Sequence, residues 1–152
     1  MKRRIARLER LAQSALSQEE RAMRAMASAR KSIEVQESAC GRLRSFHEEY
    51  SNRRHGALGN QQSGRQLANI SAFVDRLQGE ISTAEKTLQK LKENFEGRRH
   101  SWLQRRLRRQ RLEIVLQQAR DQLSELEARQ EQASFDDWTS FRGGTAKNTA
   151  SD

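Results

Sequence analysis

A single narrow apolar stripe, held in one heptad register over residues 67–133, constrains the fold of this chain more than any other feature. With Leu67 at position a, sixteen of the twenty a and d positions are apolar, and no proline interrupts them. A stripe with a 3.5-residue period stays on one side of a helix only when that helix supercoils around a partner. The stripe therefore predicts a coiled-coil helix, and three of its four exceptions, Arg98, Arg105 and Arg109, place arginines inside the seam.

The N-terminal third of the chain supplies a partner helix. With Ile5 at position a, twelve of the fifteen a and d positions from Met1 to Tyr50 are apolar or small. Several are alanine, which is the strongest helix former. Residues 52–66 then break the pattern with three glycines and several Asn, Gln and Ser residues, a composition typical of a loop.

We therefore predict an all-α fold, a long two-helix antiparallel coiled-coil hairpin. The expected elements are helix one over about 2–51, a loop over about 52–66 and helix two over about 67–133. Together they form a single domain over 1–133. Residues 134–152 form a C-terminal tail, whose last ten residues are expected to be disordered because they are small and polar.

Two registers of this hairpin are open. In the preferred alignment the numbers of facing residues add up to 117, which sets Glu19 opposite Arg98. In the alternative, one heptad further, they add up to 124, and Glu19 faces Arg105. Either alignment gives an inward-facing arginine a carboxylate partner. The preferred one leaves residues 117–133 without a partner helix, so their apolar stripe is expected to dock on another surface.

Composition excludes several classes of protein. With 152 residues and 34% hydrophobic residues, the chain has too little apolar surface for a rounded globular core. The single cysteine, Cys40, excludes an internal disulfide and is typical of a reducing cytoplasm. No apolar run follows the basic N-terminus, and none reaches about 18 residues, so neither a secretory signal nor a membrane span is expected.

The sequence contains no catalytic or metal-binding motif. The three histidines, His47, His55 and His100, are far apart, and none has a cysteine or carboxylate at metal-ligand spacing. The loop glycines lack the lysine and the strand that a phosphate-binding loop needs. We therefore expect a protein that is not an enzyme and that has no cofactor and no metal site.

Residues 98–111 hold seven arginines and no acidic residue, in a chain whose net charge is +9. A solvated face is the simple interpretation of such a run, but like charges repel unless an acidic partner compensates them. Nucleic acid is one such partner, although Trp102 is the only nearby aromatic for stacking and no groove-reading motif is present. The residues predicted to bind an acidic partner, here called the arginine block, are Arg98, Arg99, Arg105, Arg106, Arg108 and Arg109.

A second candidate site surrounds the predicted loop, where apolar residues gather in larger numbers than two helices can bury. Phe46 and Phe73 lie at g positions beside the seam and are expected to be partly exposed. The alternative interpretation of the seam members is simply core. The residues assigned to this tip patch are Leu43, Phe46, Tyr50, Phe73 and Leu77.

These residues resemble those of the FliJ family, small stalk proteins of the bacterial flagellar type III export apparatus. The resemblance rests on Leu43-x-x-Phe46-x-x-x-Tyr50 and on Gly64-x-x-Leu67-x-Asn69-x-x-x-Phe73-x-x-x-Leu77-x-x-x-Ile81. It extends to Trp102 followed by arginines and to the closing Glu131-Gln132, Phe135-Asp136-Asp137 and Arg142. The chain departs from the family at Ile70, where an aromatic residue is common, and at Asp136-Asp137, where Asp-Glu is common.

The resemblance implies a coiled coil similar to the central stalk of rotary ATPases. It implies binding to the hexameric flagellar export ATPase, to the cytoplasmic domain of the membrane export gate and to recycled export chaperones, with no nucleic acid partner. It also implies a cytoplasmic protein, peripherally associated with the inner membrane through the export apparatus and not inserted in it. The tip patch matches the gate-binding residues, and the arginine block would face the ATPase. An injectisome stalk protein and a basic coiled-coil nucleic-acid-binding protein are the alternatives.

Overall fold

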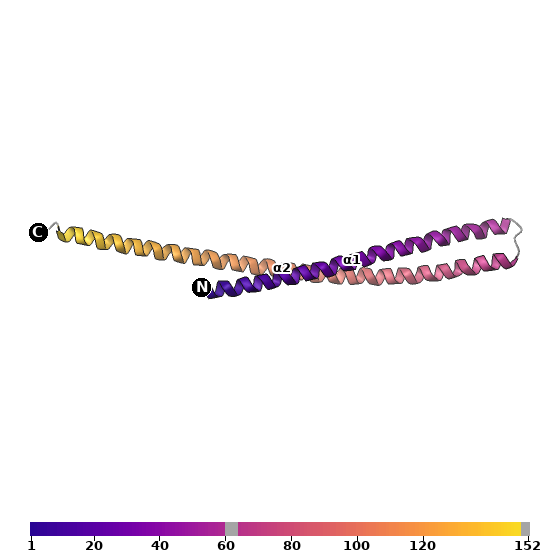
Figure 1. Cartoon of the computed structure of the whole chain (residues 1–152), viewed down its shortest axis with the longest axis horizontal. Coiled ribbons are helices and arrows are strands. Elements are labelled where there is room, and N and C mark those ends of the chain that lie inside the picture. The colour runs from indigo at the N-terminus through magenta and orange to yellow at the C-terminus, as the bar shows by residue number, and fades with distance from the viewer. Residues whose placement is uncertain (60–63, 150–152) are drawn as a thin grey trace. The chain divides into compact units, whose positions relative to one another are not determined.

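The computed structural model describes residues 1–59 and 64–149 and contains two long α-helices. Helix α1 spans Lys2–Gly59 and helix α2 spans Gly64–Thr149, and the described residues include no strand (Figure 1). Early residues of α1 pack against late residues of α2, and late residues of α1 pack against early residues of α2. The predicted all-α fold of two antiparallel helices is therefore confirmed.

The chain divides into two compact units. Unit 1 consists of Met1–Glu19 and Arg105–Asp152, and unit 2 consists of Glu20–Gln104. Each unit contains a stretch of α1 paired with a stretch of α2, so each has its own seam.

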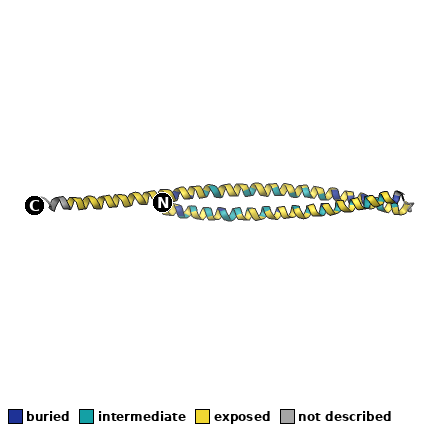
Figure 2. Ribbon diagram, turned by 90° about the horizontal axis from the view of Figure 1, so that it is seen from above, coloured by how far each residue is buried: buried dark blue, intermediate teal, exposed yellow. Residues whose placement is uncertain are grey.

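With the exception of Ala57, which lies within the stretch predicted to be a loop, the buried residues of both units occupy the predicted a and d positions. In unit 1 they are Ile5, Ala15, Leu116 and Ala119. In unit 2 they are Ala29, Cys40, Ala57, Val74, Leu77 and Ile81. Figure 2 shows these buried positions recurring along helices whose other positions are mostly exposed. Burial every third and fourth residue is what a coiled-coil seam requires.

Helix α1 continues eight residues beyond its predicted end at residue 51, as far as Gly59. Two contacts stabilise this extra stretch: Arg53 pairs with Glu49 at 2.9 Å, and its guanidinium lies 4.8 Å from the ring centre of Tyr50. Ala57 is also buried. These contacts and this burial outweigh the glycines that suggested a loop from residue 52, and helix α2 begins at Gly64 instead of residue 67.

The preferred register is wrong, and the alternative one heptad further is the one that the structure adopts. Ile5 packs with Leu116 and Ala119, whereas the preferred alignment sets it opposite Leu112. The midpoint of the connection fixes the register of an antiparallel hairpin. Because α1 ends later than predicted, the connection between Gly59 and Gly64 is centred further along the chain, and the register moves with it.

The predicted unpaired segment 117–133 is shorter than expected for the same reason. Leu123 packs against the Ile5 cluster, and Lys2 pairs with Glu127 at 3.8 Å. From residue 124 to residue 144 every position of α2 is exposed. The predicted disorder of the last ten residues concerns 143–149, which belong to α2, and 150–152, which lie outside the described residues.

Candidate partner-binding surfaces

The tip patch is assembled within unit 2 from the end of α1 and the beginning of α2. Leu43, Phe46 and Tyr50 come from α1, and Phe73 and Leu77 come from α2. The rings of Tyr50 and Phe73 meet edge to face, with centroids 4.6 Å apart and planes inclined by 69°. This is a favourable geometry for aromatic rings, so the cross-helix contact fixes both side chains.

The tip patch contains both exposed aromatic rings and buried or half-buried residues. Phe46 is 49% exposed and Phe73 is 37% exposed, which confirms the exposure predicted for these two g positions. Leu77 is 5% exposed and therefore belongs to the core, while Leu43 and Tyr50 are half-buried. A partner can reach the two phenylalanines directly, whereas Leu77 acts through packing.

Two charged residues that sequence reasoning missed border this patch. Arg53 lies over the Tyr50 ring, and Arg44 donates a hydrogen bond to Glu85 of α2 at 2.7 Å. This hydrogen bond and the charge of Glu85 raise the pKa of Arg44. Arg53 follows Tyr50 by three residues, a spacing that places both on one helix face. The pairing of Arg44 with Glu85 can be predicted only once the register of the two helices is known.

Two arginines of the arginine block belong to unit 2. Arg99 pairs with Glu96 of its own helix at 3.6 Å. Arg98 occupies a seam position but is exposed, and it lines a hollow formed with Asn94 and small residues of α1. Because alanine and serine leave room there, the arginine stem can lie along the helix while its charge stays in water.

The other four arginines of the block belong to unit 1. Arg105, Arg106 and Arg108 are exposed, and Arg105 donates a hydrogen bond to the side-chain oxygen of Gln18 at 2.8 Å. Among the described residues Arg108 forms no hydrogen bond or ion pair. These side chains present positive charge at the surface, although the heptad pattern placed Arg105 inside the seam.

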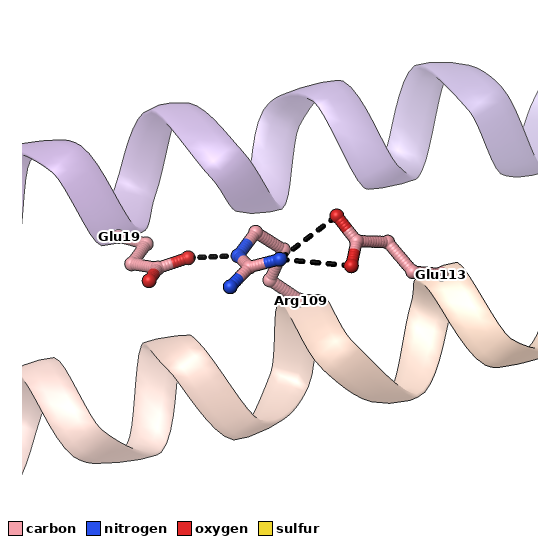
Figure 3. Close-up of polar contacts among 3 residues, drawn as sticks. All are labelled: Glu19, Arg109 and Glu113. Atoms are coloured by element: carbon pink, nitrogen blue, oxygen red, sulfur yellow. Dashed lines mark hydrogen bonds and ion pairs between the residues drawn. The ribbon is translucent and has the colours of Figure 1, made fainter.

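Arg109 differs from the other members because it points into the seam, as Figure 3 shows. Its guanidinium pairs with Glu19 of α1 and also with Glu113, at 2.8 Å. The hydrogen bond to Glu19 is the main cause that raises the pKa of Arg109, and the bond to Glu113 adds to it. The side chains of Arg109 and Glu19 are only 19% and 13% exposed. This pair links the two helices of unit 1 across the seam.

The sequence predicted that Glu19 pairs with an inward-facing arginine, but it did not predict that this arginine is Arg109. The alternative register sets Glu19 opposite Arg105, one turn before Arg109 in α2. Helical side chains tilt toward the N-terminus of their helix, so the long side chain of Arg109 reaches back to Glu19. Sequence reasoning also missed Glu113, although its spacing of four residues from Arg109 was a signal.

Within the described ranges 1–59 and 64–149, no group of three His, Cys, Asp or Glu side chains could hold a metal ion. In the same ranges, neither helix contains a stretch apolar enough to cross a membrane. Exposed rings in one unit and exposed guanidinium groups in the other are suited to non-covalent recognition.

Comparisons with known proteins give one match. The family model described as "Flagellar FliJ protein" matches residues 3–148, which is nearly the whole chain. No curated protein and no solved structure matches the chain.

Proposed function

Because the chain belongs to the FliJ family, whose members are components of the flagellar type III export apparatus, we propose that it is a non-catalytic coiled-coil adaptor of that apparatus. In this role the arginine block binds the export ATPase ring, and the tip patch binds the cytoplasmic domain of the membrane export gate. Contact with export chaperones and a peripheral position at the cytoplasmic side of the inner membrane belong to the same proposal.

The exposed arginines of unit 1 carry the ATPase part of the proposal. Arg105, Arg106 and Arg108 lie within four residues of one another on the surface of α2, and the carboxylates nearby, Glu19 and Glu113, are both engaged by Arg109. A cluster of one sign attracts an acidic surface and accelerates the encounter with it. Arg109 lies beside these arginines and pairs with Glu19 across the seam.

The exposed rings of the tip patch support the gate part of the proposal. Phe46 and Phe73 expose large apolar surfaces beside the fixed Tyr50 ring. Aromatic side chains held in one geometry bind with a small loss of conformational freedom, and they dominate many protein interfaces. The flagellar family match favours this system over the injectisome alternative.

A pull-down with two purified partners tests both halves of the proposal. Reversing the charge of Arg105, Arg106 and Arg108 to Glu should abolish capture of the export ATPase near 150 mM salt, where charge pairs still contribute. Phe46→Ala with Phe73→Ala should weaken capture of the gate domain. Each variant serves as the control for the other partner.

The helix content of both variants, measured by circular dichroism, should equal that of the wild type because the replaced residues are exposed. If the charge-reversed variant captured the ATPase unchanged, the arginine block would not be its site. If neither partner bound the wild-type chain, the adaptor role itself would be wrong.

A further inference from the structure

A second row of exposed aliphatic residues runs along α2 in unit 1, separate from the a/d seam. Leu107, Ile114 and Val115 are 50%, 58% and 37% exposed. Leu107 and Ile114 share heptad position f, which is turned away from the seam, and Val115 lies beside Ile114 at position g, which flanks the seam. Arg108 and Arg111 lie on the same face. These five residues are here called the outer strip.

The side chains of the two arginines of the outer strip form no charge pair within the ranges 1–59 and 64–149. Arg111, like Arg108, forms no hydrogen bond or ion pair with any described residue. Their neighbour Arg109, in contrast, is engaged by two carboxylates. Exposed aliphatic side chains and uncompensated like charges both gain free energy when a complementary surface covers them. The outer strip therefore has the composition of an interface that is not filled by this chain.

We propose that the outer strip is a docking site for an amphipathic helix of a partner protein. Aliphatic side chains of that helix pack on Leu107, Ile114 and Val115, and its carboxylates pair with Arg108 and Arg111. The inference rests on the proposed function, in which the partner protein that carries this helix is the export ATPase. It goes further in assigning the contact to aliphatic residues as well as to charge, and in placing Arg111 in it.

The charges along the same face give the docked helix a direction. Beyond Val115 the face continues through Asp121 and Glu125, at positions f and c, before Arg129 at position g, so a basic stretch is followed by an acidic one. A partner helix with the opposite order of charges is complementary in one orientation only. Helices of this kind bind through apolar side chains at positions i, i+3, i+4 and i+7, and Leu107 and Ile114 are seven residues apart.

This change of sign also favours a protein partner over the other acidic partners. An anionic membrane or a nucleic acid phosphate backbone is attracted by Arg108 and Arg111 but is repelled by Asp121 and Glu125. Aliphatic side chains moreover do not stack on bases as aromatic side chains do. A helix that carries both charge signs is compatible with the whole face.

Titration of the purified export ATPase against the full-length chain tests the proposal. Leu107→Gln with Ile114→Gln should weaken binding by on the order of tenfold or more, because buried aliphatic anchors dominate such interfaces. The matched control is Met23→Gln with Val35→Gln, two aliphatic residues of unit 2 that are 54% and 63% exposed. The control should bind like the wild type. A third variant, Arg108→Glu with Arg111→Glu, should lose binding near 150 mM salt.

Each outcome of the titration decides a different point. If the wild-type chain does not bind the ATPase, the proposed function fails and the docking site fails with it. If the wild type binds and the Leu107/Ile114 variant binds equally well, only the outer strip is wrong. The chain could instead bind duplex DNA or anionic phosphatidylserine vesicles through Arg108 and Arg111. If the Leu107/Ile114 variant then bound as well as the wild type, the proposed helix-docking site would be wrong and the partner would belong to that other class. Unchanged circular dichroism excludes a folding defect in any variant.

Discussion

Units 1 and 2 each pair a stretch of α1 with an antiparallel stretch of α2, but the side chains in their two seams differ. In unit 2, Val74, Leu77 and Ile81 form three successive buried seam positions of α2 beside the Tyr50–Phe73 ring contact. In unit 1, the apolar cluster of Ile5, Leu116 and Ala119 is followed by the pair of Glu19 and Arg109. The seam of unit 2 is apolar over these layers, and the seam of unit 1 includes a largely buried charge pair.

The difference shows that the two seams depend on different interactions. Aliphatic layers release free energy in proportion to the area they bury. A buried charge pair contributes little net stability, but loss of one partner leaves the other charge buried without compensation. We therefore expect unit 2 to respond most strongly to loss of volume, and unit 1 to loss of charge complementarity.

The largest effect is expected from Leu77→Ala in unit 2. Leu77 is 5% exposed between Val74 and Ile81, so its truncation leaves a cavity in the apolar seam. Substitutions of this kind lower the free energy of unfolding by about 2–4 kcal/mol. Urea unfolding followed by circular dichroism measures the change.

Leu103→Ala is the matched control for this prediction. Leu103 also belongs to unit 2 but is 39% exposed, and its truncation should change the unfolding free energy by less than about 0.5 kcal/mol. Equal effects of the two substitutions would show that the apolar seam is not what stabilises unit 2.

A smaller effect with a distinctive pattern is expected for the charge pair of unit 1. Arg109→Leu should lower the urea midpoint, because it leaves the carboxylate of Glu19 in the seam without its partner. Adding Glu19→Leu should restore the midpoint to the wild-type value or above, because two packed leucines need no charge compensation. Comparison of the single and double variants by urea unfolding gives the result.

Arg105→Leu is the control for the charge pair. Arg105 is exposed and donates only one hydrogen bond, to Gln18, so its loss should leave the midpoint nearly unchanged. A double variant that stayed as unstable as Arg109→Leu would mean that the pair contributes directly to stability, and the contrast between the units would disappear.

Much of the fold could be predicted because the heptad pattern is a local property of the sequence. The a and d positions around Leu77 and around Leu116 are buried as the 3.5-residue period requires. The register could not be predicted from the pattern alone, since alignments one heptad apart match equally well. It depends on where α1 ends, and that depends on contacts of Arg53 and on the burial of Ala57.

The residue composition of the candidate sites could be predicted from the sequence, but the orientation and contacts of their side chains could not. An arginine-rich segment is visible in the sequence, whereas the inward orientation of Arg109 follows from the register and from the tilt of helical side chains. Exposure of Phe46 followed from its g position. The outer strip was not recognised because Leu107 and Ile114 lie outside the seam, and their exposure appears only once the packed face is known.

The smallest expected effect concerns glycine, which is also distributed unequally between the units. Unit 2 contains Gly41, Gly79 and Gly97 inside its helices, whereas the described part of unit 1 has no glycine before Gly143. A methyl group built on Gly79 would meet no atom within 4 Å, apart from the local helix backbone. Gly79→Ala should therefore raise the free energy of unfolding by about 0.5–1 kcal/mol, because alanine lowers the conformational entropy of the unfolded chain and has a higher helix propensity than glycine.

Urea unfolding of Gly79→Ala and Gly97→Ala measures this gain, and the two substitutions together should add because the sites are separated by several turns. Ser124→Ala, at an exposed position of α2 in unit 1, is the control and should gain less, since serine is closer to alanine in helix propensity than glycine is. A loss of stability in Gly79→Ala would mean that another surface approaches the backbone at this position. If stability rose while capture of the gate domain fell, Gly79 would instead be part of a binding surface in unit 2.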